Sequence, residues 1–221
     1  MSNNKVSHIE ENIYIGLILT FIGGFLDAYT YILYDKIFAN TQTGNIIFFS
    51  IFLAEGDLYN AFLRLFPIFS FCIAIFLAQF LIYKFTQNKK WLKIVLIINM
   101  IFTIIIGTGI FKDNRLVIIC LVSFICSLTI GTFKKVKGDV FAPIMCTGNL
   151  RSLMEFFSKW IIYKEKKAKK TTLKYLIIIL TFCLGVFLGI FLAKYFGIYS
   201  IYICTILFLV IFLIIIYKQK I

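Results

Sequence analysis

Long apolar runs separated by short polar segments dominate this chain. Six of the runs contain about 20 residues each, the length that a helix needs to cross the hydrocarbon core of a bilayer. Two shorter apolar stretches lie near 45–54 and 149–162. The pattern predicts an all-α integral membrane protein. The six predicted spans are 13–34, 62–83, 91–111, 116–133, 173–193 and 198–217.

One tripeptide occurs twice inside these apolar regions, as Thr43-Gly44-Asn45 and as Thr147-Gly148-Asn149. Polar and helix-breaking residues are costly at membrane depth. Each copy follows a first long apolar run and precedes two further runs, so the chain divides into two halves with an offset of about 100 to 110 residues. Interrupted segments at corresponding positions of two halves point to a transport site.

The repeat predicts four segments. A cytoplasmic N-terminal tail covers 1–12, a first membrane repeat covers 13–111, a second membrane repeat covers 112–217, and a cytoplasmic tail covers 218–221.

The positive charges indicate how the tripeptide segments lie in the membrane. If these segments cross, the chain has eight spans and parallel repeats. If they dip in and return as re-entrant half-helices, it has six spans, and three crossings per repeat make the repeats inverted. Six spans place 17 of the 23 lysines and arginines on one face, as the positive-inside rule favours. We therefore expect six transmembrane helices plus two re-entrant half-helices, with both termini cytoplasmic.

The tripeptides have a predicted role at the tips of the half-helices. Gly44 and Gly148 are expected at the turns, because glycine accepts unusual backbone angles. Asn45 and Asn149, or the threonines before them, are expected as N-caps. Two helix N-termini facing the bilayer midplane favour an anion or an electronegative group. The alternative is that both tripeptides simply cap ordinary helices at loop boundaries.

Asp27 lies deep in the first apolar run. A carboxylate inside a membrane is expensive and usually faces a cavity or a partner. It can carry a coupling proton or bind a cation; the alternative is a structural partner such as a helix N-terminus or Arg151. Tyr29 can line the same cavity, although tyrosines near the end of a span are commonly interfacial anchors.

Charge and composition exclude several classes of function. The net charge of +13 resides in loops that flank the apolar runs, which indicates contact with anionic lipid and not with nucleic acid. The six cysteines form no CxxC pair or Cys/His cluster, so neither a metal site nor another cofactor is expected. No catalytic constellation is visible, so the chain is not expected to be an enzyme. Gly185 and Gly189 can form a homodimer face or pack within one subunit.

Several motifs resemble those of a known family. Gly24-Phe25-Leu26-Asp27-Ala28, then Phe38-Ala39-Asn40-Thr41-Gln42 leading into the first tripeptide, and Thr147-Gly148-Asn149-Leu150 are similar to the YoaK-like family of bacterial multi-pass membrane proteins, a domain of unknown function. The resemblance implies the bacterial inner (plasma) membrane and a transporter-like architecture. Where that family tends to carry Gly-x-Gln-Asn, this chain has Gly131-Thr132-Phe133-Lys134.

These features together predict a small secondary transporter or permease of the inner membrane. Its site would lie at the midplane, at the two tripeptides with Asp27 and Tyr29, and would take a small anionic or polar solute or ion, with proton coupling as one option. A passive channel is the close alternative. A structural or regulatory membrane subunit and an intramembrane enzyme are less favoured.

Overall fold

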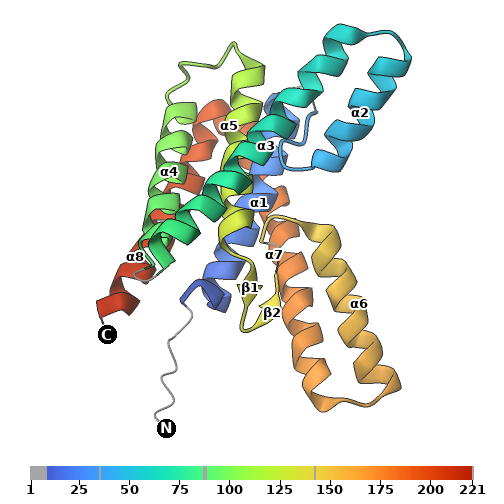
Figure 1. Ribbon diagram of the computed structural model, residues 1–221, viewed down its shortest axis with the longest axis vertical. Coiled ribbons are helices and arrows are strands. Elements are labelled where there is room, and N and C mark those ends of the chain that lie inside the picture. Colours follow the sequence, from blue (N-terminus) through green and yellow to red (C-terminus); the bar gives the residue numbers. More distant parts are fainter. Residues whose placement is uncertain (1–8, 35, 87–88, 142, 221) are drawn as a thin grey trace.

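Helices begin and end close to the boundaries of the predicted apolar runs. The computed structural model describes residues 9–34, 36–86, 89–141 and 143–220, so residues 1–8 of the predicted N-terminal tail and residue 221 lie outside it. The elements are η1 (Ile9–Glu11), α1 (Ile13–Leu33), α2 (Gln42–Ala54), α3 (Leu58–Phe85), α4 (Lys90–Gly107), α5 (Arg115–Thr132), β1 (Lys135–Val136), β2 (Asp139–Val140), α6 (Cys146–Ile162), α7 (Lys166–Phe196), η3 (Gly197–Ile201) and α8 (Tyr202–Lys220) (Figure 1).

Within the described residues, five helical segments are long and apolar enough to cross a membrane. Four are α1, α3, α4 and α5. The fifth, Lys166–Gln219, contains 54 residues and includes α7, η3 and α8. Gly197, with φ of 56°, ends α7 in a backbone region that favours glycine, and α8 then packs against α4. The chain is therefore an all-α membrane protein.

Segments that are distant in the sequence meet at one end of the molecule. The Lys89 ammonium lies 3.0 Å from the Glu10 carboxylate, which joins the region between α3 and α4 to η1. The carboxylate of Glu11 accepts a hydrogen bond of 2.7 Å from the backbone of Gly138, between the two short strands. Lys174 of α7 forms an ion pair with the same hairpin. The hairpin itself was not predicted from the apolar pattern.

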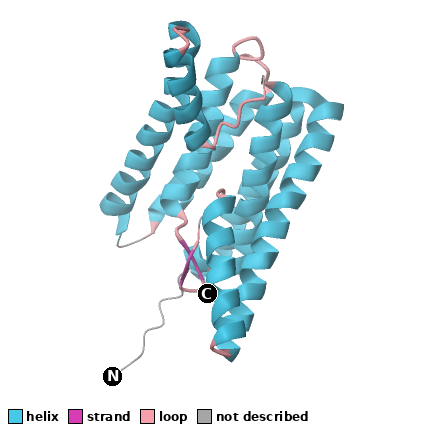
Figure 2. Cartoon of the chain, turned by 90° about the vertical axis from the view of Figure 1, so that its right-hand side faces the viewer, coloured by secondary structure: helices cyan, strands magenta, loops and turns pink. Residues whose placement is uncertain are grey.

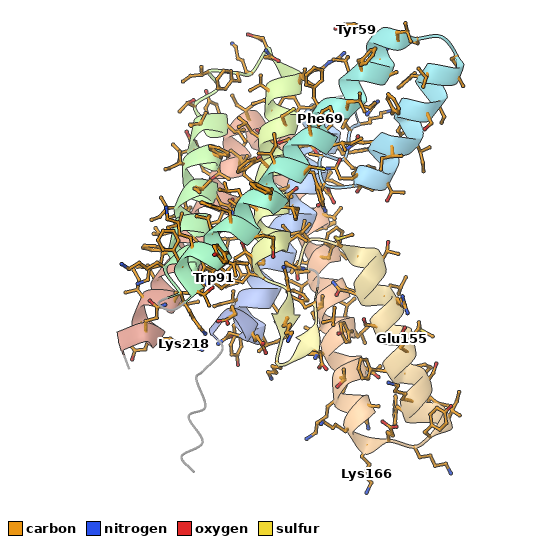
Figure 3. All side chains as sticks on the ribbon, viewed as in Figure 1. Tyr59, Phe69, Trp91, Glu155, Lys166 and Lys218 are labelled. Carbon is orange, nitrogen blue, oxygen red and sulfur yellow. The ribbon has the colours of Figure 1, made fainter. Side chains whose placement is uncertain are left out.

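This end carries most of the lysines, and we call it the lysine-rich end. Trp91, Lys166 and Lys218 lie toward it, whereas Tyr59 lies at the opposite end (Figure 3). Figure 2 shows the hairpin and the end of α8 on the same side of the bundle.

The two shorter helices, α2 and α6, run in opposite directions from the middle of the molecule. α2 lies beside α3 and extends away from the lysine-rich end, whereas α6 lies beside α7 and extends toward it (Figure 1). With 13 and 17 residues, they are about 20 and 26 Å long. Both are shorter than the roughly 30 Å hydrocarbon core of a bilayer.

Helices of the two halves pack crosswise, α1 against α7 and α3 against α5. Glycines bring α1 and α7 into backbone contact. A Cβ atom on Gly185 would lie 2.2 Å from the carbonyl oxygen of Phe21, and one on Gly24 would lie 2.3 Å from that of Phe182. Gly189 faces α1 at a similarly close distance. The Gly185 and Gly189 pair therefore packs within the subunit, and a homodimer would need another face.

The same substitution at two glycines should have opposite effects on stability. Gly185→Ala places a methyl group against a backbone carbonyl and should destabilise the protein by about 1–3 kcal/mol. Gly148→Ala meets no atom within 4 Å and should stabilise α6 by about 0.5–1 kcal/mol, because alanine favours a helix. Thermal unfolding of the purified protein in detergent measures both, and a Gly185→Ala variant as stable as the unmodified protein would contradict the packing described.

Candidate functional site

The two tripeptides lie inside the first turns of α2 and α6. Because α2 begins at Gln42 and α6 at Cys146, each tripeptide occupies helical positions two to four. The prediction for the two glycines is therefore wrong. Gly44 and Gly148 do not form the turns, since both are helical and neither has a positive φ. The chain turns earlier, before each helix begins.

The predicted N-caps are also corrected. The N-cap positions are Thr41 and Met145, and neither side chain caps its helix with a hydrogen bond. Small and polar residues occur both at N-cap positions and in the first turn of a helix. Local residue preference therefore placed the two N-caps too far along the chain.

The equivalent residues of the two tripeptides nevertheless have matching environments. Asn45 and Asn149 are both buried, with 3% exposure each, whereas Thr43 and Thr147 are exposed. Each asparagine bonds to the start of its own helix. The Asn149 amide donates to the Met145 carbonyl at 2.8 Å, and the Asn45 amide donates to the Gln42 side chain at 3.0 Å.

A chain of hydrogen bonds ties the start of α2 to two other helices. Gln42 Nε2 donates to Ser123 Oγ of α5 at 2.9 Å. The Ser123 hydroxyl in turn donates to the carbonyl of Pro67 in α3 at 2.9 Å. Within α3 the ring of Pro67 supplies no N–H to the carbonyl of residue 63. The start of α2 is thus held between α3 and α5.

Asp27 and Asn40 join the approaches to α2 and α6. Asn40 Nδ2 donates to the carbonyl of Ile144, just before α6, at 2.7 Å. Asn40 is also a neighbour of the Asp27 carboxylate, through its side chain and its backbone amide. We call Asp27, Asn40 and the Ile144 carbonyl the junction cluster. Gly23 allows this approach, because a Cβ atom there would lie 2.8 Å from Ile144 Cα.

The junction cluster retains unused hydrogen-bonding capacity. Asp27 is 6% exposed and Asn40 is 8% exposed. Within the described residues, one oxygen of each side chain, Oδ1, has no hydrogen-bond partner. A buried polar atom without a partner costs free energy and calls for an explanation, such as a bound ion, water or catalytic role.

Of the two structural partners predicted for Asp27, a helix N-terminus is closer to what is found, because its neighbour Asn40 stands just before the start of α2. Arg151 instead pairs with Glu155 on the exposed surface of α6, at 2.7 Å.

Tyr29 points elsewhere. Its side chain is fully buried, and its hydroxyl donates to the carbonyl of Ile198 in η3 at 3.2 Å. Two residues along a helix turn the side chain by about 200°, so Tyr29 and Asp27 face different neighbours. The structure brings Asp27 to the segments that lead into α2 and α6 and places Tyr29 against η3.

Sequence reasoning did not single out Asn40, Gln42 or Ser123 as site residues. Asn40 and Gln42 stand directly before the first tripeptide, in the motif on which the family resemblance rests. Ser123 and Ser127 are four residues apart in a predicted span, and a polar pair on one helical face is a usable signal. In the part of the chain that the structure describes, no group of three His, Cys, Asp or Glu side chains is arranged to hold a metal.

The junction cluster generates a prediction about energetic coupling. Asp27→Ala and Asn40→Ala should each destabilise the protein, because each leaves a buried polar group without its partner. The double variant should lose less than the sum, with a coupling energy of about 1 kcal/mol or more. Unfolding in mixed detergent micelles measures the cycle. Glu155→Ala combined with Asn40→Ala is the control pair and should be additive; additivity for Asp27 with Asn40 would refute the contact.

Comparison with known proteins identifies a family that matches this chain. No curated protein and no solved structure matches the chain. A family model described as a protein of unknown function, DUF1275, matches residues 15–214. The match covers nearly the whole chain, including both tripeptides and Asp27, and agrees with the resemblance to YoaK-like proteins. The chain therefore belongs to the DUF1275 family of proteins of unknown function.

Proposed function

We propose that this protein is a small secondary transporter or permease of the bacterial inner membrane, without enzymatic activity, for a small anionic or polar solute. One observation carries the proposal. The junction cluster places a buried carboxylate and a buried amide, each with an unpartnered oxygen, where the approaches to two opposed half-helices meet. Buried ionisable groups in membrane proteins mark substrate or ion pathways.

The architecture proposed for the membrane has six crossings and two re-entrant half-helices in inverted repeats, 13–111 and 112–217. Lys166–Gln219 would be about 80 Å long as one helix, more than twice a bilayer core, whereas α7 and α8 each fit one crossing. The short lengths and opposite directions of α2 and α6 support re-entry. The lysine-rich end would face the cytoplasm, as the positive-inside rule favours.

Packing suggests how the proposed site could open to each side of the membrane in turn. α1 and α6 pack on α7, whereas α2 and α5 pack on α3. Asp27 belongs to the first group, and Asn40 leads into the second. The hydrogen bond from Asn40 to Ile144 and the contact of Asn40 with Asp27 therefore cross the seam between the groups. Rocking of one group against the other would open these bonds to one face at a time.

The exposed side of each tripeptide supports contact with a solute. Around Gly44 and Gly148, a Cβ atom would meet open space or only Thr41, at 3.8 Å. Neither glycine is required by backbone angle or by packing in this chain. Their absence of a side chain lets a solute approach the helix N-termini, where N–H groups and the helix dipole favour negative charge. A proton on Asp27 would neutralise its charge during passage of an anion.

Anionic lipid is the proposed partner at the lysine-rich end. A cavity of about 450 Å³ lies between α1, the hairpin and α7. Lysines surround its rim and aliphatic side chains its wall, which suits a phospholipid headgroup with the start of its acyl chain. The lysines are Lys137, Lys167, Lys170 and Lys174, and the aliphatic residues are Ile13, Leu17, Leu173 and Ile177.

Thiol labelling tests the architecture. In a variant without native cysteines, Tyr59→Cys should react with an impermeant reagent only from the periplasmic side, and Lys166→Cys only from the cytoplasmic side. Lys137→Cys should behave as Lys166→Cys does. Asn3→Cys and Tyr59→Cys flank α1 and α2, so their reaction from the same side would rule out a re-entrant α2. Reaction of Lys137→Cys and Lys166→Cys from opposite sides would rule out a re-entrant α6.

Flux measurements test the site. Proteoliposomes containing an internal pH dye are challenged with gradients of nitrate, phosphate or succinate, and anion movement and pH change are recorded together. Asp27→Asn should fold normally and reduce flux by about tenfold or more, the equivalent of one lost charged hydrogen bond. Glu155→Gln, which removes an exposed carboxylate, should leave flux unchanged. Equal flux with Asp27→Asn and with the unmodified protein would reject the proposed site.

A further inference from the structure

The charge of Asp27 is not balanced by a basic side chain. The residue is 6% exposed, and among the described residues no lysine or arginine forms an ion pair with it. A titratable neighbour, the thiol of Cys126, brings no positive charge. Burying a carboxylate without a counter-charge is costly, so the group gains either a proton or a cation. The site therefore needs an occupant that carries positive charge.

Asn40 is held beside Asp27 from two sides. The hydroxyl of Thr30, in α1, accepts a hydrogen bond of 3.3 Å from the backbone N–H of Ala39. The side-chain amide of Asn40 donates to the carbonyl of Ile144 at 2.7 Å. This bond assigns the orientation of the amide, because exchanging its nitrogen and oxygen would bring two acceptors together. The network therefore fixes the oxygen of Asn40 as well as its nitrogen.

The atoms left without partners in the junction cluster are both acceptors. Within the described part of the chain, Oδ1 of Asp27 and Oδ1 of Asn40 have no hydrogen-bond partner, and neither an ionised carboxylate nor an amide oxygen can donate. The carbonyl of Ile144 has a second lone pair beyond the one that Asn40 uses. Oxygens without opposing donors form the environment of a hard cation, which binds oxygen ligands.

The charge of the cluster favours a cation with a single charge. One carboxylate is present, and the other two oxygens are neutral. Among the described residues, no three His, Cys, Asp or Glu side chains are grouped to hold a metal. A divalent ion would thus leave a positive charge uncompensated in a buried site. Sodium or potassium would leave the site neutral.

The number of oxygens distinguishes a metal cation from a proton. The three oxygens belong to α1, to the approach to α2 and to the approach to α6. A proton is shared by two oxygens at most, whereas a metal cation binds several oxygens at once, including backbone carbonyls before broken helices. A metal cation would therefore connect all three segments and hold the two groups of helices together at their seam.

We propose that the junction cluster binds a sodium or potassium ion through the oxygens of Asp27, Asn40 and the Ile144 carbonyl. This inference rests on the proposed transport function for the role of the ion, which is to couple the movement of an anionic solute to a cation gradient. The N-termini of α2 and α6 favour negative charge. A cation and an anion bound side by side would each raise the affinity for the other.

Cation binding can be measured without transport. Purified full-length protein in an uncharged detergent is titrated with sodium chloride and, separately, with potassium chloride, while choline chloride keeps the ionic strength constant. The melting temperature is recorded, since a ligand that binds the folded state raises it. At least one of the two metal cations should raise the melting temperature to a plateau relative to choline, which is too large to bind between the three oxygens.

Matched variants assign the effect to the junction cluster. Asp27→Asn should abolish the difference between the metal cations and choline, because it removes the charged ligand. Asn40→Ala should weaken the apparent affinity by about tenfold or more. Glu155→Gln, which removes an exposed carboxylate, should keep the full response. An equal response in Asp27→Asn would overturn the inference. Equal melting temperatures of the unmodified protein in all three salts would also overturn it, and that comparison requires no variant to fold.

A proton is the competing occupant, and a titration in choline chloride at falling pH distinguishes it. Stabilisation by acid, without a response to sodium or potassium, would identify a proton and overturn the assignment to a metal cation.

The flux assay separates this inference from the transport proposal. Replacing sodium and potassium by choline on both sides of the proteoliposome membrane should reduce anion flux. Stabilisation by a metal cation without any anion flux would reject the transport proposal alone. Anion flux without stabilisation by either cation would reject the cation site alone.

Discussion

Two helices of this protein, α2 and α6, begin in the middle of the molecule (Figure 1), and the buried polar groups at their starts must find partners within the chain. A buried polar atom without a partner costs free energy. Asn45 and Asn149 bond back to the starts of their own helices, and Asn40 bonds to the approach of the opposite one. The need for such partners explains why the side-chain amides of these asparagines are buried at the starts of α2 and α6. The unpartnered oxygens of Asp27 and Asn40 are what it leaves unexplained, and they are the chemical basis of the proposed site.

Crosswise packing determines how accurately that site is built. Asp27 is positioned by α1, which the glycine contacts lock to α7 of the second half. Asn40 is positioned by the approach to α2, which Gln42 and Ser123 tie to α3 and α5. The cluster therefore lies where two rigid groups of helices meet, and its geometry depends on their relative position. A site of this kind can respond to motion between the groups without any change inside either one.

Much of the fold could be predicted from the sequence, and the site only in part. Runs of about 20 apolar residues have one structural solution in a membrane, so the positions of α1, α3, α4, α5, α7 and α8 followed from length alone. Local preference failed at Gly44 and Gly148, because glycine favours turns but is also tolerated in the first turn of a helix. Asn40 and Ser123 were missed since their roles come from contacts with distant segments, such as Ile144 and Pro67, which no local pattern encodes.

The contact between α1 and α7 also bears on how the protein is made. Gly24 and Gly185 belong to the same contact between α1 and α7 in the finished molecule, yet most of the chain is synthesised between them. At typical rates of synthesis, α1 waits on the order of ten seconds before α7 emerges. During that interval its groove of small residues and the Asp27 carboxylate lack their final neighbours. We therefore expect the insertion machinery, or the helices already made, to cover this face of α1 until the last quarter of the chain arrives.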